Sequence, residues 1–443
     1  MKSLTKILGR LVLLCLFVGI LVLIVALARG YRFNLTDKTI TSTGILAFSS
    51  APSAAKIYVN DELRGVTNTN ITVPPGTYSI RISKEGFTDW QNRVTLKGEV
   101  VYSHEAVLFP KNPSLSPLTN FGVMKAIPVG QADKVLVFAQ NGDVEKDGIY
   151  LLEGNTRRIT ILSPLNTVIL LSTLPEGTDL EKTDVQFSAD YTQGIFTFVN
   201  PVAGTEYTYL LPINSTTTEP LDITNSKNTI LAAWKKEKSD TVRKLLETFP
   251  DPIEKVATDS FKVISFSPDE TKVLYQAKRS VELPVIIKPP LIGTNQTPEH
   301  RILEVDSVYV YDRKEDKNFL IPVDKAKFIV PSPSPTPEAA EGVEEPLAEV
   351  TPATDEPMFE TDNFYSVNIQ NYIQWYPTSR HLVVNEGKNF NVMEYDGINK
   401  QSVYSGPYNE NFYTLNSNWK LLILANLNPQ NNKYGDIYEV GIR

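Results

Sequence analysis

Short β-strand signals separated by polar turns recur from about Phe121 to the C-terminus, and this repetition constrains the fold more than any other feature. One complete unit runs from Val263 to Asp269 and continues from Lys272 to Ala277 as strand, turn and strand. Sheets this small bury both faces only by stacking on neighbours, so such repeats indicate an array of similar sheets. Comparable units lie near Lys134, Val185, Ile373 and Leu415.

Within this region, Phe266-Ser-Pro-Asp-Glu-Thr-Lys-Val-Leu-Tyr275 resembles the repeat of TolB-type and WD-type β-propellers. The resemblance implies a β-propeller over residues 118–443. Five blades are recognisable from the repeated units, and five to seven are compatible with the length. The chain is therefore expected to be all-β in its folded parts.

One stretch interrupts the β pattern. Apolar residues from Ile230 to Phe249 fall at helical spacing and predict a helical insertion over about 228–250. Ser239 or Asp240 is placed to begin a second helix within it. Pro250 and Pro252 are expected to end the insertion.

A second, shorter region, Gly44 to Leu108, also alternates apolar and polar residues. The alternation predicts half-buried antiparallel strands at Ile57 to Val59 and at Tyr78 to Ile82. Asn60-Asp61 and Pro74-Pro75-Gly76 supply turn residues between the strands. Several tight turns in so few residues indicate a small, independent β-module.

This region resembles the PEGA domain, a small β-sandwich of exported or surface-anchored prokaryotic proteins. The resemblance rests on two short motifs, Pro75-Gly76-x-Tyr78 and Glu85-Gly86-Phe87. The tetrapeptide that gives the family its name is replaced here by Pro52-Ser-Ala-Ala55. The resemblance implies a PEGA domain at 44–109 that works outside the cytoplasm.

Leu11 to Ala28 is an uninterrupted apolar run, long enough to span a bilayer as a helix. We expect residues 1–30 to form a cytoplasmic tip and a single transmembrane anchor, with residues 11–28 in contact with lipid. Residues 31–43 would form a stem, and the bulk of the chain would be extracytoplasmic at a prokaryotic cell membrane. Ala26-Leu27-Ala28 also fits the cleavage site of a signal peptide, which is the alternative.

The net charge of −8 comes from one segment. Residues 331–362 hold nine acidic residues, no basic residue and seven prolines. Such a composition predicts a disordered Pro/Glu-rich loop of the propeller region. The remainder of the chain is close to neutral, so nucleic acid is not an expected partner.

No motif for catalysis or for a cofactor is found. The histidines, His104, His300 and His381, lie far apart in sequence, and each is expected to be a surface residue. Asp143, Glu145 and Asp147 alternate before Gly148 and resemble the start of a calcium loop. The twelfth position is Gly154 and lacks the bidentate glutamate, so a polar hairpin is the alternative interpretation.

Exposed aromatic residues could form a carbohydrate-binding face, with Trp90, Trp375 and Trp419 as candidates. Trp375 and Trp419 occupy the same place in their repeated units, which favours packing in a core instead. We expect a non-catalytic, membrane-anchored envelope protein whose propeller binds a glycan or protein ligand. The alternative is a carbohydrate-active or hydrolytic enzyme that uses a pair of carboxylates.

Overall fold

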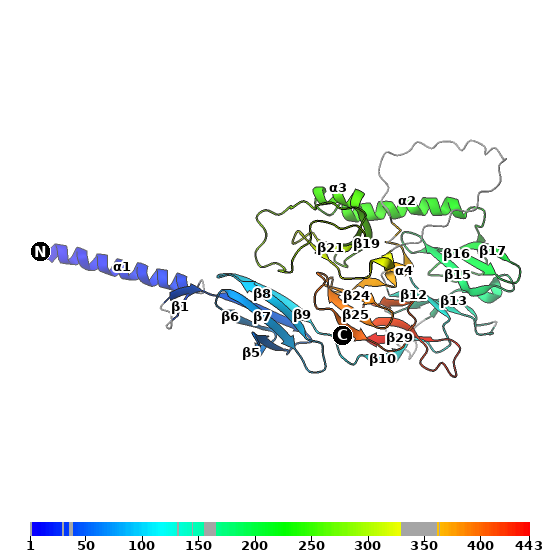
Figure 1. Cartoon of the computed structure of the whole chain (residues 1–443), viewed down its shortest axis with the longest axis horizontal. Helices are drawn as coiled ribbons and strands as arrows, with labels where there is room; N and C mark the ends of the chain where they lie inside the picture. The colour runs from blue at the N-terminus through cyan, green and yellow to red at the C-terminus, as the bar shows by residue number, and fades with distance from the viewer. Residues whose placement is uncertain are drawn as a thin grey trace. The chain divides into compact units, whose positions relative to one another are not determined.

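The computed structural model describes residues 2–28, 31–34, 39–130, 133–143, 145–154, 165–328, 361–362 and 364–443. They fall into two compact units: residues 1–111 with 287–297 form unit 1, and residues 112–286 with 298–443 form unit 2. The chain is mostly β, in many small sheets, and begins with one apolar helix (Figure 1). The all-β expectation is thus confirmed at the level of secondary structure.

The N-terminal helix, α1 (Lys2–Ala28), has the length and composition of a membrane span between Gly9 and Ala26. Its large apolar side chains from Leu11 to Val25 are exposed and are not covered by other parts of the chain. A membrane anchor and a signal sequence both meet this description. In the region predicted as a stem, β1 (Tyr31–Asn34) and β2 (Thr39–Ser42) pair as an antiparallel ribbon.

Two sheets form the body of unit 1, and one apolar core contains side chains from both of them. In strand order, one sheet is β6 (Thr69–Val73), β3 (Gly44–Ala51) and β9 (Val101–Val107). The other is β5 (Glu62–Val66), β4 (Lys56–Val59), β7 (Gly76–Ser83) and β8 (Trp90–Leu96). Ile57 and Val59 of β4 and Ile80 and Ile82 of β7 are buried at alternate positions, as the sequence pattern predicted. The arrangement is a small β-sandwich.

The predicted turn at Asn60-Asp61 is confirmed. Val59 pairs with Glu62, and both intervening residues have positive φ, 50° and 63°. This is the backbone of a type I′ hairpin, which favours Asn and Asp because they tolerate the left-handed region. One detail differs from the expectation of antiparallel strands: β3 and β9 run parallel. The long connection through the other sheet allows this pairing.

Residues 287–297 also belong to unit 1, although they are distant in sequence. The Gln296 side-chain amide accepts a hydrogen bond from the Thr95 N–H (2.7 Å) and donates one to the Thr95 carbonyl (3.0 Å). Thr95 lies on β8, the edge strand of its sheet. Gln296 therefore satisfies backbone groups that an edge strand leaves unpaired.

The described residues of unit 2 form five four-stranded antiparallel sheets. Sheets 1 to 4 are each formed by consecutive strands, numbered here in chain order. Sheet 1 is β11 (Lys125–Pro128), β12 (Lys134–Ala139), β13 (Gly148–Glu153) and β14 (Leu165–Leu170). Sheet 2 is β15 (Asp179–Phe187), β16 (Gln193–Asn200), β17 (Thr205–Pro212) and β18 (Leu221–Asp222). Sheet 3 is β19 (Phe261–Phe266), β20 (Lys272–Ala277), β21 (Val308–Asp312) and β22 (Lys317–Leu320). Sheet 4 is β23 (Ile373–Trp375), β24 (His381–Asn385), β25 (Phe390–Glu394) and β26 (Gln401–Tyr404).

Sheet 5 differs because it joins the two ends of unit 2. Its order is β10 (Ser114–Pro117), β29 (Asp436–Gly441), β28 (Leu421–Ala425) and β27 (Tyr413–Leu415). Ser114 pairs with Gly441, and Pro117 pairs with Tyr438. Residues 110–117 lie between the two regions predicted from the sequence, 44–109 and 118–443, whereas in the structure β10 is an outer strand of this sheet.

Apolar cores lie between the sheets of unit 2. Sheets 1 and 2 share one core, sheets 3 and 4 share another, and sheets 5 and 1 share a third. Between sheets 4 and 5, Tyr413 Oη donates to the Val383 carbonyl (2.9 Å) and packs on Phe390. These neighbouring sheets therefore bury each other's faces, whereas sheets 2 and 3 share no core among the described residues and each packs against α2.

The same turn joins the first two strands of sheets 2 and 3. In sheet 2, Asp190 Oδ1 accepts hydrogen bonds from Ser188 Oγ (2.7 Å) and from the N–H and hydroxyl of Thr192. In sheet 3, Asp269 receives the same three bonds from Ser267 and Thr271. Each turn satisfies its own polar groups, which explains why the Ser-x-Asp-x-Thr pattern recurs.

The helical insertion is longer than predicted and breaks elsewhere. α2 (Lys227–Leu246) continues through Ser239 and Asp240, and α3 (Asp251–Ser260) follows it. The prediction that Pro250 and Pro252 end the insertion was wrong: Pro250 is the N-cap of α3, and Pro252 lies in its first turn, where no N–H is needed. Trp234 of α2 packs on sheet 2, and Val242 packs on sheet 3.

The Pro/Glu-rich loop predicted at 331–362 lies outside the described residues except for Thr361 and Asp362.

Candidate functional site

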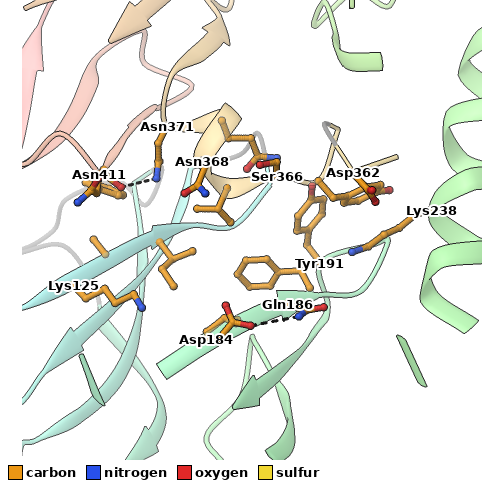
Figure 2. Close-up of a pocket in the computed structure, with 18 of the residues that line it drawn as sticks. Lys125, Asp184, Gln186, Tyr191, Lys238, Asp362, Ser366, Asn368, Asn371 and Asn411 are labelled. Atoms are coloured by element: carbon orange, nitrogen blue, oxygen red, sulfur yellow. Dashed lines mark hydrogen bonds between the residues drawn. The ribbon is translucent and has the colours of Figure 1, made fainter. Parts of the chain in front are cut away.

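The candidate site is a cavity of about 820 Å³ in unit 2, shown in Figure 2. It is lined by β11, by β15, by the segment that precedes β23 and by the segment that precedes β27. In sheets 1, 2 and 4 these are the first strands or the residues leading into them, and β27 is the outer strand of sheet 5 opposite β10. α2 adds Leu231, Trp234, Lys235 and Lys238, whose i, i+3, i+4, i+7 spacing places them on one helix face.

Lys238 carries one cationic group into this cavity. Its Nζ lies 4.4 Å from the centre of the Tyr365 ring, a cation–π contact. Burial lowers the pKa of Lys238 to about 8, and the Asp362 carboxylate acts in the opposite direction. Figure 2 shows Lys238 directed toward Asp362. The charge of this lysine therefore changes within one or two pH units of neutrality.

Two tyrosines form the aromatic part of the site. The rings of Tyr191 and Tyr365 lie 5.9 Å apart, and the Tyr365 hydroxyl donates to the Ala189 carbonyl. Burial raises the pKa of Tyr365 to about 12 and raises that of Tyr191 further. Both phenols remain neutral at physiological pH, so they offer aromatic faces and hydroxyl groups to a ligand.

Lys125 of β11 lies on another part of the wall. Its Nζ donates to the carbonyls of Glu181 (3.3 Å) and Thr183 (2.6 Å). Burial lowers the pKa of Lys125, whereas the nearby Asp184 carboxylate raises it. Asp184 in turn accepts a hydrogen bond from Gln186 Nε2 (3.4 Å; Figure 2). The negative charge of Asp184 thus partly offsets the cost of burying the positive charge of Lys125.

Side-chain amides cover the part of the wall near α4 (Val367–Gln370). Asn371 follows α4 directly and donates from Nδ2 to the Asn411 carbonyl (2.5 Å; Figure 2). Its Oδ1 is buried and has no hydrogen-bond partner among the described residues. Asn368 and Asn409 also line the cavity. A buried amide oxygen without a partner costs free energy, so a ligand that donates to Asn371 would bind favourably here.

The predicted calcium residues lie elsewhere, in the turn between β12 and β13. Asp143 Oδ2 is 2.8 Å from Lys146 Nζ, while the buried Asp147 accepts hydrogen bonds from the N–H groups of Asn141 (2.7 Å) and Gly142 (2.8 Å). Glu145 donates its N–H to Asp143. Within the described residues, no group of three or more acidic, histidine or cysteine side chains has the arrangement of a metal site. The calcium site stays a prediction.

The three histidines are not brought together. His104 stacks on Trp90 at 4.3 Å in unit 1. The His300 backbone pairs with Asn318, and His381 is buried beside Thr378 at 3.2 Å. The surface position expected for His381 was therefore wrong. None of the three is among the residues that line the described cavity.

The tryptophans also differ from the expected register. Trp90 and Trp375 are buried in cores, as the packing interpretation predicted. Trp419, however, lies in the turn after β27, with φ of 67°, and so does Ser379 after β23, with φ of 59°. Trp419 therefore corresponds to Ser379, and Leu415 to Trp375. Instead of filling a core, Trp419 is covered by the Arg443 guanidinium at 3.5 Å.

Sequence reasoning missed the residues of the cavity. They come from four sheets and from the helices α2 and α4, and no motif connects them. The sequence offered one indication that α2 contributes to the cavity. Lys235 and Lys238 lie on the same face of the helix as the apolar Trp234.

Residues 43–112 match the PEGA domain family. This supports the PEGA domain expected at 44–109. No curated protein matches the chain.

Proposed function

We propose that unit 2 is a five-bladed β-propeller that binds an uncharged glycan of the cell envelope in the cavity around Asn371. Three features support the propeller: the five similar sheets, the cores between consecutive sheets, and the pairing of β10 with β29. A last sheet that takes one strand from the opposite end of the chain is what a closed ring of blades requires. α2 contacts both sheets 2 and 3.

The proposed location follows from the N-terminal part of the chain. PEGA domains are extracellular modules, and α1 could serve either as an anchor or as an export signal. We favour a single-pass anchor with both units outside the cytoplasm, because the apolar run exceeds the usual core of a signal peptide. The cavity would then face molecules of the envelope.

The observation that carries the ligand class is the unpartnered Oδ1 of Asn371. An acceptor of this kind selects a ligand with a hydroxyl or N–H donor. Nearby amides and tyrosine rings supply further polar groups and flat apolar surfaces, as a sugar ring requires. Lysines and carboxylates are balanced in the wall: Lys125, Lys235 and Lys238 against Glu181, Asp184 and Asp362. The balance favours an uncharged ligand over a strongly anionic one.

The charged groups also favour binding over catalysis. Glycoside hydrolysis needs two carboxyl groups that face each other across the scissile bond. Here Asp184 acts on Lys125, and Asp362 acts on Lys238. Each carboxylate therefore has a lysine as an electrostatic partner.

The test is a screen of prokaryotic envelope glycans against the full chain in lipid nanodiscs. We expect saturable binding of a neutral glycan, and Asn371→Leu should weaken it roughly 5- to 100-fold, since a lost buried hydrogen bond costs about 1–3 kcal/mol. Asn166→Leu, at an exposed position of β14, is the matched control and should bind normally. Failure of every glycan to bind the folded protein would reject the proposal. Turnover of a bound glycan that Asp184→Asn abolishes would support the enzyme instead.

The pH dependence tests the charge of the ligand. Lys238 loses its proton as pH rises through about 8. A neutral glycan should bind with similar affinity at pH 7 and pH 9. An affinity that falls over this range, and that becomes pH-independent in Lys238→Met, would show an anionic ligand.

A further inference from the structure

Unit 2 contains a second pocket, of about 320 Å³, with a different chemical character. Its walls come from β19, β23 and β27 and from the turn after β11. Apolar side chains dominate, with Ile264, Ile369, Ile373 and Leu415 among them. The volume lies at the lower end of the range of about 300–1,000 Å³ that is typical of small-molecule sites.

Two hydrogen-bonding groups in this wall have no partner. Trp375 Nε1 and Ser265 Oγ are both buried, and neither has a hydrogen-bond partner among the described residues. Trp375 is 6% exposed and Ser265 is 5% exposed. An indole N–H can only donate, and a hydroxyl can donate or accept. Native proteins rarely leave two such groups unsatisfied in one place.

Two other polar side chains of the pocket are hydrogen-bonded within the protein. Gln374 Nε2 donates to the carbonyls of Gln370 (2.8 Å) and Tyr413 (3.1 Å). Asn416 Nδ2 donates to Glu439, and its Oδ1 accepts from the Lys420 N–H. Trp375 Nε1 and Ser265 Oγ are the buried side-chain groups of this wall that lack a partner among the described residues.

The backbone explains how Ser265 reaches this position. The pairing of β19 with β20 shifts register between Val263 and Ser265, as in a β-bulge. A bulge changes the direction of side chains, and both Ile264 and Ser265 line the pocket.

We propose that this pocket binds a small, mainly apolar molecule that carries a carbonyl or similar acceptor oxygen. The apolar walls would enclose the hydrocarbon part. The oxygen would accept a hydrogen bond from Trp375 Nε1 and, through its second lone pair, from Ser265 Oγ. This site is distinct in chemistry from the amide-lined cavity, although Gln370 lines both.

A pair of matched probes tests the proposal on the full chain in lipid nanodiscs. One probe is 4-tert-butylcyclohexanone, and the other is the same ring with a methylene group in place of the carbonyl oxygen. The chain has four tryptophans, so 5-fluorotryptophan labelling gives a small ¹⁹F NMR spectrum in which Trp→Phe variants assign each signal. We expect the ketone to shift the Trp375 signal saturably. The methylene probe should bind roughly 5- to 150-fold more weakly, the range expected for two hydrogen bonds.

Variants separate a binding site from a packing defect. Ser265→Ala and Trp375→Phe, the latter followed at another tryptophan or by calorimetry, should each reduce the preference for the ketone, and the double variant should abolish it. Ser265→Leu should fill the pocket and exclude both probes without lowering stability. Asn371→Leu, in the other cavity, should bind the ketone normally. Equal binding of the two probes, or no saturable shift at Trp375 in the folded protein, would overturn the proposal.

Discussion

The two units bury their apolar residues in different ways. In unit 1, a single core contains side chains from both sheets of the sandwich. In unit 2, sheets 1 to 4 are local runs of strands, but the cores lie between neighbouring sheets, and one of them joins sheets 5 and 1 from opposite ends of the unit. The sandwich therefore depends on the residues of one core, whereas unit 2 depends on all its sheets being present. Three predictions test this difference.

The largest effect is expected from loss of β29. Truncation before Asp436 removes a central strand of sheet 5 and the partner of β10. We expect unit 2 to lose its cooperative unfolding transition in calorimetry, because sheets 1 and 4 lose their packing partner, while the transition of unit 1 persists. Removal of Arg443 alone is the control and should cost about 0.5–1 kcal/mol, the value of an exposed cation–π contact with Trp419. A cooperative unit 2 without β29 would contradict a closed arrangement.

A smaller effect, confined to unit 1, is expected from Trp90→Ala. Trp90 is 2% exposed and packs between Phe48 and His104. The cavity should lower the free energy of unfolding of the sandwich by about 3–5 kcal/mol. Trp419→Ala, at a half-buried turn position, should cost less and should affect unit 2. Chemical denaturation monitored by limited proteolysis would show which unit loses stability in each variant. Equal shifts of both transitions would show that the units unfold together.

The smallest effect concerns the repeated turn. Asp269→Ala removes three accepted hydrogen bonds, and we expect a loss of about 1–2 kcal/mol from unit 2, because the carboxylate is 40% exposed. Burial raises the pKa of Asp269, but the hydrogen bonds from Ser267 and Thr271 outweigh it and hold the pKa well below the usual range.

The sign of the pH dependence follows from that direction. A folded pKa below the unfolded value means that the stabilisation is present above about pH 4 and is lost as pH falls below it. Denaturant titrations between pH 2 and pH 6 should show a weaker acid dependence in Asp269→Ala than in the unchanged protein. Asp190→Ala, in the matching turn of sheet 2, should behave similarly because its pKa is also lowered, chiefly by Ser188. Identical acid profiles with and without Asp269 would contradict this role.

The fold was predictable from sequence where local residues determine the backbone. Asn60 and Asp61 specify a two-residue hairpin, and Ser267 to Thr271 specify a self-contained turn. The repeated units were visible for the same reason. The parallel pairing of β3 with β9 and the pairing of β10 with β29 were missed, because nothing local in Ser114 to Pro117 indicates a partner near the C-terminus.

The candidate sites were less predictable. Lys125, Lys238 and Asn371 meet only after sheets and a helix have assembled, and each is an ordinary residue within its own segment. Trp375 was noticed, but the register assigned to Trp419 was wrong because an aromatic residue in a turn was mistaken for one in a strand. Unsatisfied hydrogen-bonding groups, which point to both proposed sites, are visible only in three dimensions.

The closure of sheet 5 also has a consequence for biosynthesis. Thr119, just after β10, donates from its hydroxyl to Asp436 at 2.9 Å, and 317 residues separate the two in sequence. At a synthesis rate of about 5–20 residues per second, the first of these residues waits on the order of 15–60 s for the second. Throughout that time β10 has an unpaired edge and cannot complete its sheet. The nascent chain would therefore need protection from aggregation until its final strand is made, and a product of premature termination would be a substrate for proteolysis.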